Sequence, residues 1–448
     1  MQMNMQFPVG SLWRIQQPQV SEFEKKVTQT GATIVGLDMG GNTADDVDKT
    51  AKAKKKIIFL LLQELMSPPL ERELTKDKPD AVLTDFATLA GCSVADKLDL
   101  PLLINLPGPI SLLQAFVGMV DTSTAVNFLG LHIARQRLST MRFIGWMNFN
   151  QMGQWGARVR AFIAKGAVVL VQTVWGLDQP TSLPPNVVVT GPVLPPAHDL
   201  RKKLAADHPE LHNFLRQSEP AGVVYVTTGS LAKLHDWQVR VIYNGLKKAR
   251  CRVVWSLKGE LQQFLPVADD PDFYISKWTP QAELLQDDAV KAVITHCGWG
   301  GTLECMTAGK PIVAIPFFGD QPENAHLLVK AGVGELIGKI PRGDEQKPNP
   351  YKEGWMTEET VCLAVSKLLN NPSYKKATEK LMRASRASGG AEAAVQHIEW
   401  AARFGTKHLA SEYLRHGTGS NPYNGVMVGI LGLVACAGLL VYSQALRK

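Results

Sequence analysis

The chain has 448 residues, of which 45% are hydrophobic and 20% are charged, so a disordered protein is excluded and two or three globular domains are possible. The net charge of +7 comes from scattered basic residues with one short run at 52–56. Because no basic stripe is interleaved with aromatic residues, a nucleic-acid partner is not expected. The cysteines show no paired or metal-ligand spacing, which predicts free thiols and no metal site; they lie at 92, 251, 297, 305, 362 and 436.

The first half of the chain alternates short apolar runs with helical patterns, which predicts parallel strands joined by crossover helices. Strands are expected at 32–38, 56–62, 80–85, 100–107, 167–173 and 186–192. Helices are expected near 21–29, 88–97 and 111–119. A proline-rich, charged stretch at 192–210 then predicts an interdomain linker.

The alternation resumes in the second half, with strands expected at 223–228, 252–257, 273–276, 292–295 and 311–316. Helices are expected at 236–249, 301–309, 320–331 and 357–370, followed by one long terminal helical segment at 374–404. Two doubly wound domains of this kind would face each other across a cleft. Ligands would then bind at the carboxyl ends of the strands.

Residues 426–442, VMVGILGLVACAGLLVY, are uncharged and almost wholly apolar. Their number is at the short end of the roughly 17–25 residues that a membrane-spanning helix needs. We therefore predict one C-terminal transmembrane helix, with a buried core helix as the alternative. Basic residues flank both ends of the segment, so the charge rule leaves its orientation open. The beginning, MQMNMQFPVG, has no basic region and no apolar region of a secretory signal.

The string THCGWGGTLE places Gly298, Gly300 and Gly301 between an expected strand and an expected helix. Glycine lets backbone amides approach a ligand closely, and a helix N-terminus adds partial positive charge, so the string predicts a phosphate cradle. It is neither a GxGxxG fingerprint nor a Walker motif. His296 at the strand end would donate a hydrogen bond to a diphosphate, and Glu304 would accept ribose hydroxyls. A plain strand–helix turn is the alternative for this string alone.

A wider pattern continues on both sides of the glycines: WTPQ at 278–281, HCGWG at 296–300, Glu304, PFFGDQ at 316–321 and Asn324-Ala325. With these spacings the chain resembles the family of UDP-dependent glycosyltransferases, whose fold is GT-B, an α/β arrangement of two facing Rossmann-like domains. The resemblance implies a UDP-sugar as co-substrate, with no cofactor and no metal ion.

The resemblance also implies a role for each residue of the donor site. Trp278 would stack on the uracil, and Gln281 would help to hold the nucleoside. The glycine amides and His296 would bind the diphosphate, while Asp320 and Gln321 would hold hydroxyls of the transferred sugar. The full donor set is Gly229, Ser230, Trp278, Thr279, Gln281, His296, Gly298, Trp299, Gly300, Gly301, Glu304, Asp320 and Gln321.

This chain departs from the family pattern at Gly300 and Gly301, where plant and animal relatives usually have asparagine and then serine. The backbone cradle is retained, but side-chain hydrogen bonds to phosphate are lost unless Thr302 replaces them. A lower affinity for the donor is therefore expected.

Residues 79–103 resemble the acceptor domain of the same family, and Asp85 matches its catalytic aspartate. In the family this aspartate orients a histidine from the first βα loop, and the histidine removes the proton of the acceptor hydroxyl in an inverting displacement. The first histidine of this sequence is His132. Two interpretations stay open: the first βα unit is missing from the sequence, or residues 7–18 are a degenerate first loop with Leu12 or Ile15 at the histidine position.

The sequence therefore predicts a UDP-dependent glycosyltransferase that transfers a hexose, with inversion, to a hydroxyl of a small lipophilic acceptor. The predicted anchor and the apolar segment 110–130 suggest the lipophilic acceptor. An inactive UDP-sugar-binding pseudoenzyme or partner subunit is the alternative. The expected location is the endoplasmic reticulum membrane, on either side. The expected organisation is an acceptor domain at 1–195, a linker at 196–221, a donor domain at 222–405, a tether at 406–425 and the transmembrane helix at 426–442.

Overall fold

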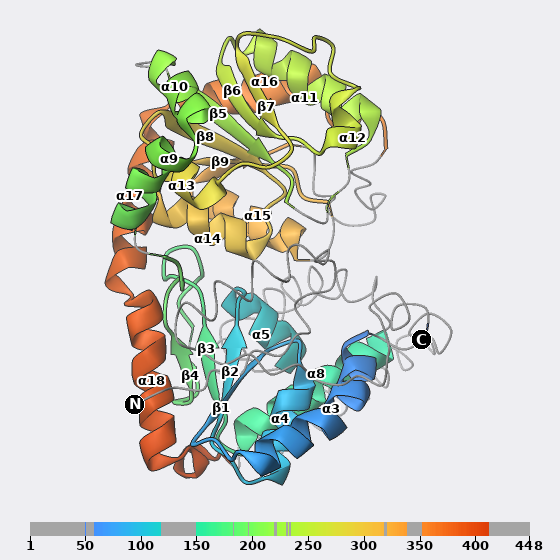
Figure 1. The fold of residues 1–448 in the computed structure, drawn as a ribbon, viewed down its shortest axis with the longest axis vertical. Helices are drawn as coiled ribbons and strands as arrows, with labels where there is room; N and C mark the ends of the chain where they lie inside the picture. Colours follow the sequence, from blue (N-terminus) through green and yellow to red (C-terminus); the bar gives the residue numbers. More distant parts are fainter. Residues whose placement is uncertain are drawn as a thin grey trace, which may run out of the picture.

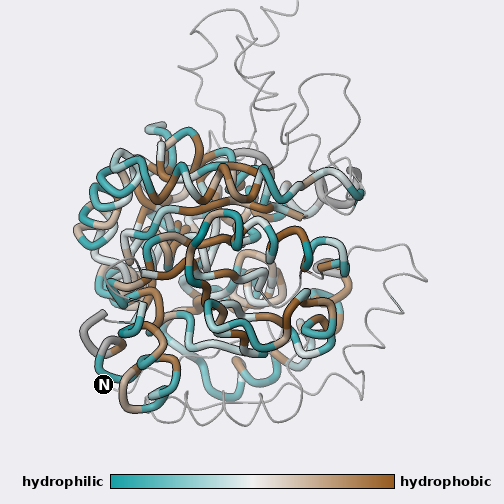
Figure 2. Tube along the Cα trace, turned by 90° about the horizontal axis from the view of Figure 1, so that it is seen from above, coloured by the Kyte–Doolittle hydropathy of each residue, from teal (hydrophilic) through white to brown (hydrophobic). Residues whose placement is uncertain are grey.

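The computed structural model describes position 50 and residues 58–117, 149–181, 183–195, 197–218, 222–229, 232, 234–317, 320–337 and 352–411. In this part of the chain, two parallel sheets form two lobes, and helices pack around each sheet (Figure 1). Figure 2 shows hydrophobic stretches in the interior and hydrophilic residues along the outer turns of the helices. The α/β class with parallel sheets, expected from the alternating pattern, is confirmed.

The first sheet has the strand order β1-β2-β3-β4 among the described residues, and each neighbouring pair is parallel. Leu103 and Ile104 of β2 point to opposite faces of the sheet, and both are fully buried. Both faces are therefore covered, as is usual for parallel sheets. The strands are β1 (Val82–Asp85), β2 (Leu102–Leu106), β3 (Val168–Val171) and β4 (Val187–Val189), and the helices of this lobe are α3 (Ile58–Lys76), α4 (Leu89–Lys97), α5 (Ile110–Val117) and α8 (Phe149–Ala164).

The second sheet has the order β10-β9-β8-β5-β6-β7, again with parallel neighbours. Alternate residues of β5 enter two separate apolar clusters, one on each face, so this sheet is also buried on both sides. Its strands are β5 (Val223–Thr227), β6 (Arg252–Ser256), β7 (Phe273–Ser276), β8 (Val290–Thr295), β9 (Ile312–Ala314) and β10 (Gly334–Leu336). Its helices are α11 (Asp236–Lys248), α12 (Gly259–Gln262), α13 (Gln281–Leu285), α14 (Trp299–Thr307), α15 (Gln321–Lys330), α16 (Glu358–Asn370) and α17 (Pro372–Ala387).

The strand expected at 56–62 is wrong, because residues 58–76 form the helix α3. Leu62, Met66, Leu70 and Leu74 follow one another at intervals of four and are all buried. Burying each of them stabilises the fold by about 1.5–3 kcal/mol, which offsets the cost of about 3 kcal/mol for each of the two prolines inside the helix. The four-residue interval was the signal for a helix. The strand expected at 32–38 and the helix near 21–29 lie outside the described residues.

The stretch expected to be a linker folds into two helices, α9 (Ala197–Asp207) and α10 (Pro209–Gln217). Leu204, Leu211 and Leu215 from these helices belong to the apolar cluster on one face of the second sheet. The connection between the lobes is therefore partly a packed element of the second lobe.

The single helical segment expected at 374–404 is two helices, α17 and α18 (Gly390–Phe404), because the chain turns at Gly389 with a left-handed φ of 88°. At this turn the Gly390 amide donates to the carbonyl of Thr190, 2.8 Å away. α18 then lies against the first sheet, where Ala401 is fully buried in a cluster with Leu103 and Leu170. Figure 1 shows α17 beside the upper lobe and α18 beside the lower one. Thus α18 returns the chain to the first lobe, which contains β1.

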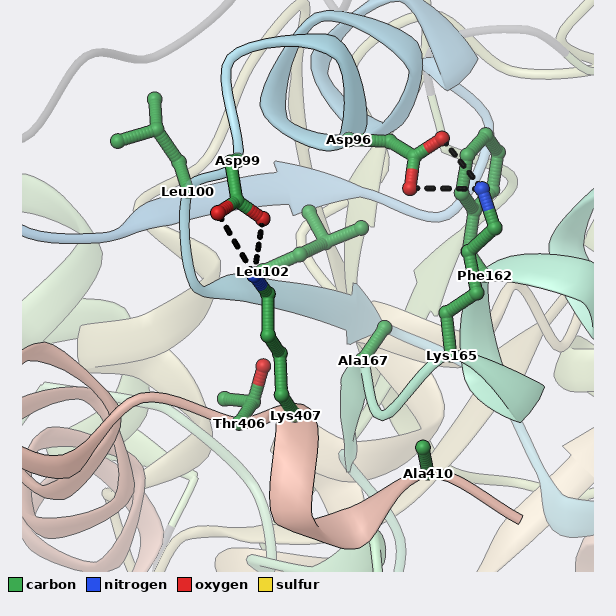
Figure 3. A pocket seen from close by; sticks show the side chains of 10 residues that line it. All are labelled: Asp96, Asp99, Leu100, Leu102, Phe162, Lys165, Ala167, Thr406, Lys407 and Ala410. Atoms are coloured by element: carbon green, nitrogen blue, oxygen red, sulfur yellow. Dashed lines mark hydrogen bonds and ion pairs between the residues drawn. The ribbon is translucent and has the colours of Figure 1, made fainter.

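After α18 the short helix η2 (Lys407–Leu409) lies against the first lobe and borders a hollow of ≈ 320 Å³ (Figure 3). Two exposed ion pairs lie at this hollow: Lys165 Nζ is 2.6 Å from Asp96 Oδ2, and Lys407 Nζ is 2.5 Å from Asp99 Oδ1. The Lys407 ammonium lowers the pKa of Asp99. Because exposed ion pairs of this kind contribute little to stability, the apolar contacts of α18 hold this segment in place.

Within the described residues, no helix has both the length and the apolarity needed to span a membrane. The predicted transmembrane segment 426–442 lies outside them.

We expect Ala401→Asp to lower the free energy of unfolding by about 3 kcal/mol, because it places an unpaired carboxylate between α18 and the first sheet. Ala391→Asp is the matched control, since it makes the same change at an exposed position of the same helix. Thermal unfolding of both variants measures the difference. Equal melting temperatures would show that α18 does not depend on this contact.

Candidate functional site

The glycine turn follows β8 at the carboxyl edge of the second sheet and leads directly into α14. Cys297 in this turn has a left-handed φ of 64°, and Gly298 is the N-cap of α14. The first amides of a helix have no acceptor within the helix, so those of Trp299, Gly300 and Gly301 are available to a ligand. The turn therefore presents the features of an anion site.

His296 lies between two glycines that come from neighbouring strands. A Cβ atom built on Gly229 would lie 2.5 Å from Cε1 of the imidazole, and one built on Gly298 would lie 2.6 Å from Nε2. Real Cβ atoms do not approach other atoms so closely, so the ring occupies space that only glycine leaves open at both positions. Gly229 also has a positive φ of 67°, which favours glycine on backbone grounds.

The surroundings of His296 keep its imidazole uncharged. Burial lowers the pKa of His296 to about 4, and Nδ1 lies 3.3 Å from the hydroxyl oxygen of Thr295. A neutral imidazole carries one N–H and one acceptor nitrogen, so it can donate one hydrogen bond to an oxygen of an anionic ligand.

A second group of polar residues lies close to the glycine turn, where Gln281 Nε2 is 3.6 Å from the Cβ position of Gly301. Gln281 Nε2 donates to Glu304 Oε2 at 2.6 Å, and Tyr225 Oη donates to Gln281 Oε1 at 3.2 Å. Tyr225 Oη is also 2.8 Å from the hydroxyl of Thr279. Burial raises the pKa of Glu304, whereas the hydrogen bond from Gln281 lowers it. Beside this group, Trp278 has 66% of its surface exposed and therefore has an indole face available for stacking.

The acidic residue of the PFFGDQ string is tied to the glycine turn through Asn324. The amide nitrogen of this buried asparagine is 2.7 Å from Asp320 Oδ2 and 2.9 Å from the carbonyl oxygen of Cys297. Burial raises the pKa of Asp320. Gln321 is buried, and its Oε1 accepts a hydrogen bond from the backbone amide of Phe317 at 2.9 Å. Asp320 is therefore held in a fixed position relative to the turn.

Three residues near the turn differ in the space around them. Gly300 has no heavy atom within 4 Å of a Cβ position, and Gly301 has Gln281 Nε2 at 3.6 Å, so the lack of a side chain at Gly300 is not imposed by crowding. The hydroxyl of Thr302 is buried without a hydrogen-bond partner among the described residues. Replacement of the missing serine and asparagine side chains by Thr302 stays a prediction. Ser230 lies outside the described residues.

Asp85 is the last residue of β1, at the carboxyl edge of the first sheet. Its Oδ1 accepts a hydrogen bond from the Ala87 amide at 2.9 Å, and burial raises its pKa. The adjacent Phe86 amide donates to the carbonyl of Asn105 at the end of β2, 2.9 Å away. The aspartate is thus anchored to its own sheet by backbone contacts.

A polar residue that the sequence analysis missed connects the two lobes. Gln172 follows β3, and its Nε2 donates to Asn105 Oδ1 at 2.7 Å. Its backbone carbonyl accepts a hydrogen bond from the indole N–H of Trp299 in α14, also at 2.7 Å. The indole of Trp299 therefore contacts the first lobe. The available signal was a single polar residue at the end of each apolar run, Asn105 after LLI within β2 and Gln172 after VVLV.

The comparisons with known proteins agree with this geometry. A family model described as UDP-glucoronosyl and UDP-glucosyl transferase matches residues 146–415. The chain is 26% identical over 327 residues to cyanidin-3-O-glucoside 2-O-glucuronosyltransferase from Bellis perennis, covering 70% of this chain and 69% of that protein. It is 24% identical over 423 residues to UDP-glucuronosyltransferase 2B14 from Oryctolagus cuniculus, covering 88% and 73%.

Two solved structures are similar to the fold described above. Medicago truncatula UGT71G1 complexed with UDP-glucose has a TM-score of 0.61 at 20% identity, with 84% of this chain and 87% of that chain covered. Os79 from O. sativa in complex with UDP has a TM-score of 0.61 at 16% identity, with 83% and 88% covered. At these identities the likeness shows the fold alone, and it confirms the expected GT-B-like arrangement of two parallel-sheet domains.

We expect the stability of the wild type to fall relative to His296→Gln as the pH drops from about 6.5 to about 4. The pKa of the folded histidine is about 4 against 6.5 for an unperturbed one, so in this window the unfolded state binds a proton that the folded state does not. The loss should reach about 1–2 kcal/mol at pH 5.

The difference in unfolding free energy between the two proteins cancels the contribution of the buried carboxylates. Their raised pKa values change stability with pH in the opposite direction. Denaturant unfolding at pH 7.5 and at pH 5 gives the values, with exposed His408→Gln as the control. A difference that is independent of pH would contradict a neutral His296.

Proposed function

Since this chain belongs to the UDP-glucoronosyl and UDP-glucosyl transferase family, we propose that it transfers a glucuronosyl or glucosyl unit from a UDP-sugar, with inversion, to a hydroxyl of a small lipophilic acceptor. One observation carries the donor part of this proposal. A neutral His296, fixed between Gly229 and Gly298, lies beside the N-terminus of α14, the helix that also carries Glu304.

Each part of a UDP-sugar has a chemically suitable partner at this edge. The diphosphate is proposed to lie on the first amides of α14, with one hydrogen bond from His296. The ribose hydroxyls are proposed to donate to the Glu304 carboxylate, and the uracil to stack on the exposed face of Trp278. Asp320, held by Asn324, is proposed to accept hydroxyls of the sugar, and buried Gln321 to shape that subsite.

In the proposed reaction the acceptor oxygen attacks the anomeric carbon from the side opposite to UDP. The new carbon–oxygen bond forms as the bond to the diphosphate breaks, so the configuration inverts and UDP leaves. A base takes the proton of the acceptor hydroxyl. Asp85, at the carboxyl edge of the first sheet, is proposed to orient this base and stabilise its charged form.

The acceptor is proposed to be lipophilic because the segment that follows β2, residues 110–130, is rich in apolar residues. The predicted segment 426–442 would also place the protein at a membrane, where such acceptors concentrate. The endoplasmic reticulum is the proposed membrane, with its side left open.

A second candidate function is UDP-sugar binding without turnover. It rests on the observation that the first histidine in the sequence, His132, comes after Asp85, so the histidine partner expected in an early loop is absent from residues 1–84. Donor binding and turnover therefore need separate tests.

We expect Gly298→Ala to weaken UDP binding at least tenfold and Gly300→Ala to change it by less than about twofold. Both glycines lie at the N-terminus of α14, but only a Cβ at 298 would displace the imidazole of His296. Isothermal titration calorimetry with UDP measures both. Equal affinities of the two variants would contradict the proposed role of His296.

We expect Asp85→Asn to abolish sugar transfer from UDP-glucose or UDP-glucuronic acid while leaving UDP affinity within about twofold, because Asp85 belongs to the other sheet. The rate of UDP release, measured with and without hydroxylated aromatic acceptors, reports on transfer and hydrolysis. A wild type that binds UDP but transfers no sugar would support the second candidate instead.

A further inference from the structure

We propose that Tyr225 is a positioning residue of the donor site: its hydroxyl fixes the amide orientation of Gln281, which in turn aims one oxygen of Glu304 at the ribose. This inference rests on the proposed function, because it assigns a role within the same nucleotide site.

Tyr225 is well placed to act on Gln281 without contacting the nucleotide itself. It lies in the middle of β5 and has 1% of its surface exposed, with its ring in the apolar cluster that also contains Val254 and Leu303. Only its hydroxyl reaches polar groups: Thr279 Oγ1 at 2.8 Å, Gln281 Oε1 at 3.2 Å and the hydroxyl of Thr227 on the same strand.

The direction of the hydrogen bonds follows from chemistry. Gln281 has one donor end and one acceptor end, and an ionised carboxylate can only accept. The amide nitrogen must therefore face Glu304 Oε2, 2.6 Å away, and the amide oxygen must face Tyr225. Tyr225 has a single proton, which it gives to Gln281, so the hydroxyls of Thr279 and Thr227 donate to the phenol oxygen. The relay then runs in one direction, from Thr279 through Tyr225 and Gln281 to Glu304.

This order determines what Glu304 offers to a ligand. The bond from Gln281 occupies Oε2 and holds the carboxylate plane, so Oε1 is left as the acceptor for ribose hydroxyls. The same bond opposes the effect of burial, which raises the pKa of Glu304, and so favours its ionised form. Without the Tyr225 hydroxyl, the Gln281 amide loses the bond that sets its orientation, and Glu304 loses a fixed partner.

The test uses the full-length protein and two nucleotides, UDP and 2′,3′-dideoxy-UDP, which lacks both ribose hydroxyls. We expect Tyr225→Phe to weaken UDP binding by about fivefold, which is equivalent to one hydrogen bond. Its affinity for the dideoxy nucleotide should stay within twofold of the wild-type affinity. The preference for UDP over its dideoxy analogue is thus reduced. If Tyr225 had a merely structural role, the variant would bind both nucleotides more weakly by the same factor.

Tyr243→Phe is the matched control, because it removes another tyrosine hydroxyl of the same domain. That hydroxyl donates to Asp270, and its ring stacks on Phe273 at the opposite end of the sheet. We expect both affinities to stay within twofold of the wild type in this variant. In a Gln281→Leu background, adding Tyr225→Phe should produce no further loss of ribose preference, since the tyrosine acts through the glutamine.

If Tyr225→Phe weakens the binding of both nucleotides equally, or changes neither affinity, the inference is overturned while the proposed function stays intact. If Tyr225→Phe does not fold, Thr279→Val removes the other end of the relay and should reduce the ribose preference by about twofold; an unchanged preference would again overturn it. A wild type that binds neither nucleotide would refute the proposed donor site itself, and the role of Tyr225 with it.

Discussion

The packing of Val174 and Leu177 into the apolar cluster of the second lobe is the contact on which the site depends. Both residues follow β3 of the first sheet, and both are buried among residues of the second lobe. Burying two such side chains stabilises the junction by about 3–6 kcal/mol. It brings the end of β3 against α14, where the indole of Trp299 bonds the carbonyl of Gln172. The glycine turn at the start of α14 is therefore held close to the edge of the first sheet, which carries Asp85.

The two halves of the proposed active site are linked through this junction by polar contacts as well. The side chain of Gln172 donates a hydrogen bond to the side chain of Asn105. The backbone carbonyl of Asn105 accepts a hydrogen bond from the amide of Phe86, next to Asp85. A displacement of the glycine turn would therefore be transmitted toward Asp85, the proposed catalytic residue, through the contacts of Trp299, Gln172 and Asn105. Such coupling suits a reaction in which the acceptor oxygen and the anomeric carbon must be held about 3–3.5 Å apart and in line. The return of α18 to the first sheet adds a second connection between the lobes, independent of Gln172.

The sequence was sufficient to locate most strands, because parallel strands buried on both faces are continuous apolar runs bounded by turn residues. FYIS at 273–276 is such a run, and β7 has the same bounds. An apolar run alone does not separate a buried strand from a buried helix, which is why residues 56–62 were misassigned. The apolar faces of α9 and α10 could not be recognised in the sequence, because prolines and charged residues surround them. Where α18 lies could not be predicted, since the spacing of Ala394, Ile398 and Ala401 shows an apolar face but not the sheet that covers it.

The site shows the same division between local pattern and three-dimensional arrangement. The glycines, the histidine and Glu304 are recognisable because they follow one strand at short spacing. The state of His296, however, depends on Gly229, which is remote in sequence and arrives only because Thr227 of β5 pairs in register with Thr295 of β8. That register brings a residue without a Cβ against the imidazole, buries the ring and lowers its pKa. A charged imidazolium would hold the UDP product as firmly as the donor, whereas a neutral N–H adds a directional bond at a smaller cost in desolvation. The protonation state of His296 is thus set by the pairing of two strands.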